Sequence, residues 1–500
     1  MTMRYALTVI KHTFIWAGLG LVINSCQISE QDAASEQAAD AMRGVESGLL
    51  PAIVVRGEAA PTATLEERMA FFKVPGVSIA VIKDGALHWS QGYGIADSAR
   101  QTMVDTATLF QAGSISKPLA ALAALRLVQE GRLDLDADVN TYLKSWQIPE
   151  HEFAGEAPVT LRHLLTHTGG TTVHGFPGYT HQDSFPSVIS VLEGKGNTPA
   201  VVVDTKPGTN WRYSGGGYTI MELVVEDVTG MPLEEYTEAY VLDPLGMRGS
   251  TFAQPLPDSQ HGRASAAYDA TGKYIEGGWH NYPEQAAAGL WTTPNDLARY
   301  AIAMQHAYAG EDEHVLNQEM VEAMFTKHEN GWGLGPALSG EGDSLRFQHG
   351  GKNAGFSNVF FAFAKKGGDG LIVMTNADQG VSLMQEIQRA ASDYYGWGIA
   401  QPDTIERVEL TDVEYTGFTG TYVYRGERPS LEGYQVRITY AEGQLQVYGP
   451  DEEGQMNVLI PTARDSFIDR YTSDQIAFER SAQGTVTGFV YNDTYRFERK

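Results

Sequence analysis

The sequence is short of cysteine and of basic residues. Its 500 residues include a single cysteine, Cys26, which excludes an internal disulfide. Lysine and arginine number 36 against 62 aspartates and glutamates, so the net charge is −26. A surface this acidic repels nucleic acid and anionic membranes, and we expect neither as a partner. The simplest interpretation of the charge is solubility.

A long apolar run is missing at the N-terminus, where residues 14–23 are apolar but too few to span a bilayer. With basic residues before it and the small Ser25 after it, this run has the pattern of a secretory signal peptide. The motif that ends at Cys26 resembles a bacterial lipobox, although Asn24 is unusual there. We therefore expect residues 1–26 to be a lipoprotein-type signal peptide, with Cys26 lipidated and the protein exported, periplasmic and anchored at the outer membrane. A plain secreted protein with an incidental cysteine is the alternative.

The length predicts two folded units. Residues 27–59 are predicted to be a tether and lead-in, because glutamine, alanine, serine and acidic residues are abundant in their first half. Residues 60–396 mix strand and helix patterns. Residues 404–500 show short alternating runs between glycine and aspartate turns, which predicts an all-β barrel or sandwich.

Local patterns within the larger unit are clear. An Asp-Gly turn at residues 84–85 joins two β-rich runs and predicts a hairpin. A leucine- and alanine-rich helix is expected from 117 to 130, ended by a glycine. Further helices are expected at 65–72, 161–167, 218–229, 294–304 and 382–395, and a strand pair at 357–364 and 369–375.

Ser114 and Lys117 are the first candidates for chemistry. Ser114 precedes the predicted helix, and residues three apart share a helix face, so Lys117 can reach the serine hydroxyl. A neighbouring amine can accept the hydroxyl proton, and a helix N-terminus favours the negative charge that develops. An S-x-x-K pattern arises by chance in a chain of this length, and a serine cap beside a solvated lysine is the alternative.

Two later segments carry further candidates. Tyr213 lies on a glycine-rich loop that enters a helix. A phenol is a poor base unless a cation such as Lys117 lowers its pKa. His349 follows a short β-like run and precedes Gly350 and Gly351, which would let a substrate backbone approach a strand edge. A packing tyrosine and an ordinary loop histidine are the alternatives.

In this order the three segments resemble the active-site elements of class C β-lactamases and their relatives, the family VIII carboxylesterases, D-aminopeptidases and D,D-peptidases. The family pattern is S-x-x-K, Y-x-N, then K-T-G or H-x-G. Flanking runs such as 161–170 (LRHLLTHTGG) are also similar, and the resemblance covers residues 60–396. It implies an α/β (α+β) fold, with an antiparallel sheet flanked by helices, a helical lobe, and the site between them. Several relatives carry a lipocalin-like β module at the C-terminus.

The resemblance also implies residue roles. Ser114 would be the nucleophile, Lys117 its proton partner and Tyr213 the general base. The backbone N–H groups of Ser114 and Lys352 would form the oxyanion hole, and no metal or organic cofactor is implied. The residues expected to contact substrate or line the oxyanion hole are His349, Gly350, Gly351, Lys352 and Gly215.

Two positions depart from the family pattern. Gly215 stands where asparagine is common, and His349 stands where β-lactamases have lysine. A histidine is only partly charged near neutrality. Both changes weaken the case for β-lactams, so we expect an ester or another amide as the substrate. A β-lactamase or a D,D- or D-amino-acid peptidase is the alternative, and a catalytically idle cell-wall-binding module is a further one.

Other site types have little support. His163 and His167 have the spacing of a zinc pair, but Leu164 stands where the H-E-x-x-H motif needs glutamate, and no third ligand is apparent. The sequence has no G-x-S-x-G motif around a serine, no phosphate loop and no dinucleotide fingerprint. Four tryptophans could line an apolar cleft or belong to the core: Trp211, Trp279, Trp291 and Trp332.

Overall fold

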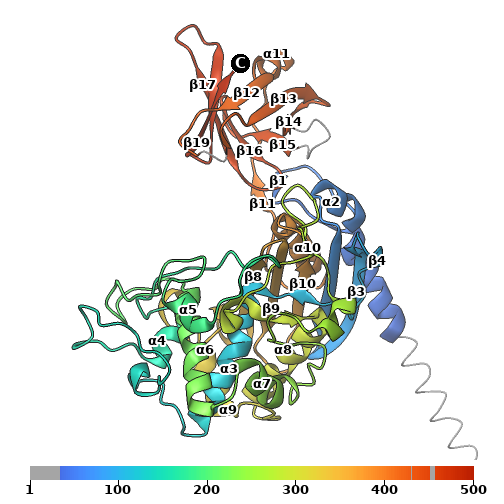
Figure 1. Cartoon of the computed structure of the whole chain (residues 1–500). Coiled ribbons are helices and arrows are strands. Elements are labelled where there is room, and N and C mark those ends of the chain that lie inside the picture. Colours follow the sequence, from blue (N-terminus) through green and yellow to red (C-terminus); the bar gives the residue numbers. More distant parts are fainter. Residues whose placement is uncertain (1–33, 429–430, 451–456) are drawn as a thin grey trace, which may run out of the picture.

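The computed structural model describes residues 34–428, 431–450 and 457–500. The expected signal peptide and Cys26 lie outside these residues. The chain forms a larger unit, in which a sheet packs beside a helical lobe, and a C-terminal barrel (Figure 1). No helix in the described ranges combines the length and the apolar character that a membrane crossing requires.

The larger unit is built on a seven-stranded antiparallel sheet. The predicted hairpin is present as β2 and β3, and Asp84 (φ 52°) and Gly85 (φ 74°) form its turn. Two positive φ values match the twist of the flanking strands, which is why an Asp-Gly pair suits this turn. The strand order is β4-β3-β2-β10-β9-β8-β7. The strands are β2 (Gly76–Lys83), β3 (Ala86–Asp97), β4 (Thr102–Met103), β7 (Ala337–Ser339), β8 (Arg346–Asn353), β9 (Phe356–Phe363) and β10 (Gly370–Thr375).

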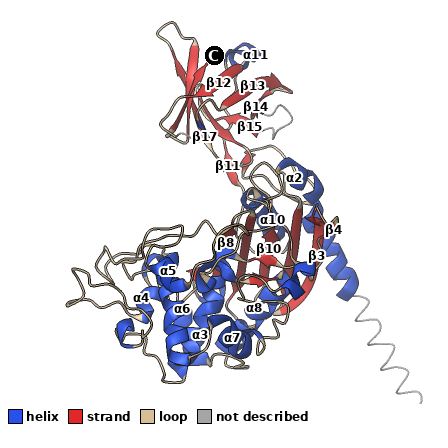
Figure 2. Ribbon diagram, in the orientation of Figure 1, coloured by secondary structure: helices blue, strands red, loops and turns tan. Residues whose placement is uncertain are grey.

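Both faces of the sheet are covered by helices (Figure 2). In β2 the side chains of Ile79 and Val81 belong to the cluster that contains α10 residues, and those of Ala80 and Ile82 lie on the opposite face, toward α8. This alternation explains why the strand is apolar throughout. The helices of this unit are α2 (Leu65–Phe71), α3 (Ser116–Gln129), α4 (Leu161–Leu165), α5 (Val188–Leu192), α6 (Gly215–Thr229), α7 (Leu233–Thr237), α8 (Pro294–Tyr308), α9 (Gln318–Met324) and α10 (Gly380–Tyr394).

The predicted tether is wrong over its described part, because residues 34–47 form a helix. Ala41 and Val45 are buried in the cluster that also contains Leu383 and Ile387 of α10. The apolar residues recur at helical spacing and form one stripe, which the polar composition of the segment conceals. The lead-in is likewise structured, since β1 (Ile53–Val55) pairs in parallel with β11 (Asp403–Ile405).

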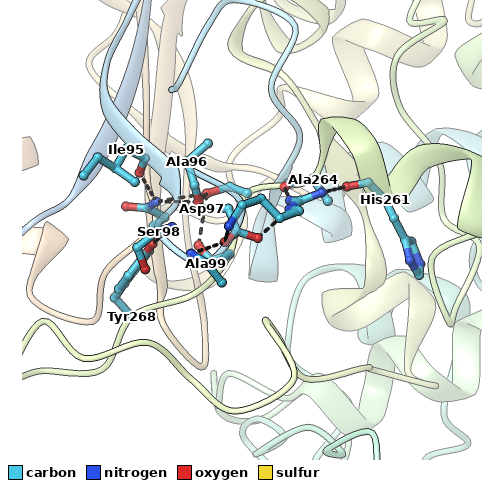
Figure 3. Close-up of polar contacts among 12 residues, drawn as sticks. Ile95, Ala96, Asp97, Ser98, Ala99, His261, Ala264 and Tyr268 are labelled. Carbon is cyan, nitrogen blue, oxygen red and sulfur yellow. Dashed lines mark hydrogen bonds and ion pairs between the residues drawn. The ribbon is translucent and has the colours of Figure 1, made fainter. Parts of the chain in front are cut away.

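A polar network fixes the end of β3 to the segment that follows residue 260 (Figure 3). The buried Asp97 carboxylate accepts hydrogen bonds from the backbone of Ala99 and from the Arg100 side chain. The Arg100 guanidinium also donates to the backbone carbonyls of His261 and Ala264. This network fixes residues 261–264 to the end of β3.

The C-terminal module is a closed eight-stranded barrel, so the predicted all-β fold is confirmed. Six strands match the alternating runs in the sequence. The other two, β15 and β16, are not among the runs that the sequence predicts. A short helix, α11 (Asp412–Gly417), precedes the barrel. Its strands are β12 (Gly420–Tyr424), β13 (Gln435–Ala441), β14 (Gln444–Tyr448), β15 (Asn457–Pro461), β16 (Ser466–Asp469), β17 (Gln475–Arg480), β18 (Val486–Tyr491) and β19 (Tyr495–Arg499).

A buried ion pair marks the junction of the two units. The Arg68 guanidinium donates to both carboxylate oxygens of Glu386 at 2.7 and 2.8 Å. The guanidinium carbon also lies 4.2 Å from the ring centroid of Tyr471, which belongs to the barrel. The Ile53 N–H donates to the Arg470 carbonyl oxygen at 3.0 Å. The barrel is therefore attached to the larger unit by packing and hydrogen bonds as well as by the chain.

Candidate active site

Ser114 lies in a tight turn between a short strand and α3. The strand β5 (Phe110–Gln111) leads into Gly113 (φ 56°), and Ser114 follows in the 3₁₀ turn Gly113–Ile115. A Cβ on Gly113 would lie 2.6 Å from the Lys352 backbone nitrogen, so glycine is required there. The turn is held by Ser116, whose hydroxyl donates to the Gly113 carbonyl oxygen at 2.6 Å.

Lys117 reaches Ser114 as the spacing predicts. Its Nζ lies 3.1 Å from the Ser114 Oγ and 2.7 Å from the Ala287 carbonyl oxygen. The side chain is 2% exposed, and this burial lowers the pKa of Lys117 to about 7. Desolvation disfavours the ammonium form, so a neutral amine is accessible near neutral pH. A neutral amine can donate to Ala287 and still accept the Ser114 proton.

Tyr213 lies beside this pair, but its pKa differs from the expectation. Lys117 Nζ lies 4.9 Å from the Tyr213 ring centroid. Burial raises the pKa of the phenol, and the nearby Ser114 hydroxyl offsets this only partly. The predicted lowering of this pKa by Lys117 is wrong, because burial also removes charge from Lys117. The Tyr213 hydroxyl is buried without a hydrogen-bond partner among the described residues.

The edge of β8 completes the turn around Ser114. A Cβ on Gly351 would lie 1.9 Å from the Ala112 carbonyl oxygen, so this glycine permits the close contact between β8 and the serine turn. Gly350 is exposed, and a Cβ there would meet one backbone oxygen at 3.8 Å. The contact of Gly113 with Lys352 places the backbone N–H groups of Ser114 and Lys352 in neighbouring segments. The Lys352 side chain is exposed, with its Nζ 4.0 Å from Asp378.

His349 is buried and uncharged rather than partly charged. Its Nδ1 donates to the Gly350 carbonyl oxygen at 2.5 Å, which leaves Nε2 as an acceptor. That Nε2 is buried and has no partner among the described residues. Burial lowers the pKa of His349 to about 3, and the nearby Lys117 contributes to the lowering. The position therefore offers a substrate a neutral hydrogen-bond acceptor.

Gly215 does not lie at an open wall of the site. It is the first residue of α6, and its N–H donates to the His174 carbonyl oxygen at 3.0 Å. A Cβ there would lie 2.9 Å from the Phe176 ring and 3.1 Å from the same carbonyl oxygen. The segment from His174 to Phe176 occupies the space into which a side chain at this position would extend. The substrate contact expected at Gly215 is thus corrected to a packing contact.

His167 is a site residue that the sequence suggested only as a metal ligand. It has a positive φ (60°) and follows the end of α4. Its Nδ1 accepts a hydrogen bond from the Ser214 N–H at 3.1 Å, and its ring centroid lies 4.3 Å from that of Tyr213. Burial holds the pKa of His167 well below its usual value. His163 instead interacts with Thr160 at the start of α4.

The described residues contain no group of three or more histidine, cysteine, aspartate or glutamate side chains that could hold a metal ion. Two of the four tryptophans lie beside Tyr213: the Trp332 ring centroid is 5.7 Å away and the Trp211 centroid 6.4 Å. Trp279 and Trp291 pack on each other, with Trp291 in the core. His174 also borders the site, with its ring 4.9 Å from that of Tyr213. No motif in the sequence identified His174.

The π-helical turn η5 (Gln285–Gly289) supports Lys117 from behind. Buried or half-buried polar side chains hold this turn and the following Leu290 through four hydrogen bonds. Glu222 Oε2 accepts from the Ala286 N–H at 2.8 Å, Asn353 Nδ2 donates to the Ala288 carbonyl at 3.0 Å, Gln254 Nε2 donates to the Gly289 carbonyl at 2.7 Å, and Ser116 Oγ accepts from the Leu290 N–H at 3.0 Å. The carbonyl that receives Lys117 is thereby fixed in position.

The beta-lactamase family model matches residues 62–424. The chain belongs to the beta-lactamase family. The chain is 31% identical over 210 residues to the esterase EstB of Burkholderia gladioli, covering 39% of this chain and 52% of that one. It is 29% identical over 263 residues to the unguisins hydrolase ungD of Aspergillus violaceofuscus, covering 49% and 44%. The chain thus spans about half the length of these curated relatives.

A solved structure supports the fold across both units. The octameric penicillin-binding protein homologue from Pyrococcus abyssi superimposes with a TM-score of 0.57 at 22% identity. The match covers 87% of this chain and 98% of that one, so it extends well beyond the family model. The expected fold of a beta-lactamase-like unit with a C-terminal β module is therefore confirmed. The two named relatives support serine hydrolase chemistry in this family.

Replacing Gly351 by alanine should abolish activity while the protein stays folded. The new methyl group would collide with the Ala112 carbonyl and push β8 away from the serine turn. The matched control is Gly350→Ala, which has room for a methyl group and should keep most activity. Ester hydrolysis and circular dichroism of both variants provide the measurement. Equal activity in the two variants would contradict the role given to this contact.

Proposed function

We propose that the protein is a serine hydrolase that cleaves an ester or amide bond through an acyl-enzyme on Ser114. The observation that carries the proposal is the 3.1 Å contact between Ser114 Oγ and the Nζ of a fully buried lysine whose pKa is about 7. A lysine with its ordinary pKa would be a solvated cation at neutral pH. Here burial prepares the amine to act as a base.

In the proposed first step, Lys117 accepts the Ser114 proton while the serine oxygen bonds to the substrate carbonyl carbon. The carbonyl oxygen becomes an oxyanion, which the backbone N–H groups of Ser114 and Lys352 stabilise. The bond to the leaving group then breaks, and the leaving group takes the proton that Lys117 accepted, so that Lys117 is neutral again. Water attacks the acyl-serine by the same route, releases the acid and restores the Ser114 hydroxyl.

Tyr213 remains the predicted general base in the family pattern, but its raised pKa favours a different assignment in the resting enzyme. A phenol that keeps its proton is a hydrogen-bond donor. We therefore assign the resting base to Lys117 and place Tyr213 where it can donate toward the leaving group. Either assignment uses both residues, since they flank the same hydroxyl.

We propose a neutral ester as the preferred substrate, with other amides next. Support comes from His349, whose pKa of about 3 keeps it uncharged, so a substrate carboxylate would find no cation at this position. The aromatic rings of Trp211 and Trp332 beside Tyr213 favour an apolar acyl group. One similar protein is an esterase, which agrees with this preference. A β-lactamase or a D-amino-acid peptidase is the second candidate, favoured by the resemblance of the motifs.

We further propose that the protein is exported and held at the outer membrane through lipidated Cys26. The support is the sequence alone: a basic start, a short apolar run and a lipobox-like motif.

Replacing Ser114 by alanine should lower hydrolysis of short p-nitrophenyl esters by about a thousandfold or more, because the covalent route is lost. The wild-type protein should also form an adduct with a fluorophosphonate that mass spectrometry maps to Ser114. Undiminished turnover in the variant would refute the assignment. Turnover of nitrocefin faster than of esters would instead favour the β-lactamase, and an inert wild-type protein would favour the idle binding module.

The pH profile should report the unusual Lys117. Only the neutral amine can accept a proton, so kcat/KM should rise with pH through about 7 and then level off. Below that value the rate should fall about tenfold per pH unit. Lys117→Arg should be inactive throughout, since arginine stays protonated. A wild-type profile that is flat between about pH 5.5 and pH 8 would contradict this assignment.

Lipidation of Cys26 should be visible in cells that express the full chain. Metabolic labelling with an alkyne fatty acid should tag the wild-type protein, and fractionation should place it with outer membranes. Cys26→Ser should lose the tag and become soluble in the periplasm. A wild-type protein that is secreted without the tag would support the plain signal peptide instead.

A further inference from the structure

The barrel is filled at one end by aromatic side chains. Phe418, which directly follows α11, is fully buried there. Its ring centroid lies 4.6 Å from that of Phe478 and 5.0 Å from that of Phe467. Together with Tyr422 these rings form an ordinary packed core. Because these rings fill the space, we expect no ligand at this end of the barrel.

A cavity of about 710 Å³ extends between the barrel and the larger unit. Most of its barrel wall is apolar or aromatic, and Val436, Ile438, Leu459, Ile476, Phe489 and Phe497 contribute buried side chains. The cavity is open to solvent, so its exposed apolar wall stays in contact with water, and covering that wall with an apolar ligand is favourable. The volume falls within the range of small-molecule sites, about 300–1,000 Å³.

The wall of the cavity includes one buried carboxylate. Asp469, at the end of β16, is 1% exposed and lines the cavity. Its Oδ1 accepts the backbone N–H groups of Tyr471 and Thr472 at 2.8 and 2.9 Å. Its Oδ2 has no hydrogen-bond partner among the described residues. Burial raises the pKa of Asp469 to about 6, so the carboxylate is largely charged at neutral pH.

We propose that the barrel lumen binds an amphiphile with an apolar tail and a protonated amine head, the head pairing with Asp469. The tail removes apolar wall from water, which is the main driving force for such a ligand. Asp469 Oδ2 has no donor and no cation beside it among the described residues. An ammonium group would supply both. This site goes beyond the proposed hydrolase function and uses none of its residues.

The larger unit supplies the rest of the wall. Phe72, Lys73, Ala270, Thr271 and Gln379 line the cavity from that side. The site is therefore complete only in the full chain. Lys73 offers a cation that would suit a carboxylate head, but it is partly exposed and solvated. Asp469 is buried, so pairing with its unpartnered oxygen contributes more binding free energy than pairing with the solvated ammonium of Lys73. A fatty acid is accordingly the comparison ligand.

The experiment is isothermal titration calorimetry of the full chain with decylamine and decanoate, each below its micelle concentration. At about pH 7.5 the amine is protonated and Asp469 is ionised. Decylamine should bind the wild-type chain, and Asp469→Asn should weaken it about tenfold or more, because the amide keeps the turn but loses the charge. Val447→Phe, which fills the lumen from another wall, should weaken it similarly.

The matched control is Glu498→Gln, the same change at an exposed carboxylate on the barrel, and it should shift the affinity by less than about twofold. Ser114→Ala should bind decylamine normally, which separates this site from the hydrolase site. Three outcomes would overturn the proposal: decanoate binding as tightly as decylamine, Asp469→Asn binding like the wild type, or Val447→Phe leaving the affinity unchanged.

Discussion

The burial of Lys117 is the constraint on which the site depends. A lysine that is 2% exposed loses its hydration, and in an apolar setting the cost is large unless the group becomes neutral or finds acceptors. The structure supplies one carbonyl acceptor, from Ala287, and one hydroxyl, from Ser114. No carboxylate in the described part of the chain pairs with it, and its pKa accordingly falls to about 7. A paired carboxylate would have restored the charge and removed the base.

That arrangement works only if the Ala287 carbonyl and the serine turn cannot move. The polar groups around η5 hold the Ala287 carbonyl in place. One of them, Glu222, is so deeply buried that its pKa is raised well above the usual value. The serine turn is held by its contact with β8. Gly113 and Gly351 permit this contact, because a side chain at either position would collide with the other segment. Contacts between backbone segments therefore position the reactive side chains of Ser114 and Lys117.

The sequence predicts which residues form this site better than it predicts their protonation states. Ser114 and Lys117 follow from helix spacing, and the hairpin follows from its Asp-Gly turn. The neutrality of His349 and the raised pKa of Tyr213 do not, because burial depends on distant segments. The packing of Phe176 on Gly215 and the position of His174 beside Tyr213 could not be predicted either, because both depend on contacts between segments that are distant in the sequence. The helix at 34–47 was missed for a different cause: its apolar stripe is short and made partly of alanine.

Burial also gives the site a single electrostatic character. It lowers the pKa of Lys117, His167 and His349 and raises that of Tyr213, so all four groups favour their uncharged forms. A charged substrate would lose its hydration on entry and would find no permanently charged partner among these four groups. A neutral carbonyl enters at less cost, and a full negative charge then develops on its oxygen only in the transition state. In the proposed mechanism, the backbone N–H groups of Ser114 and Lys352 would stabilise that charge without having stabilised the substrate, which is the difference that accelerates a reaction.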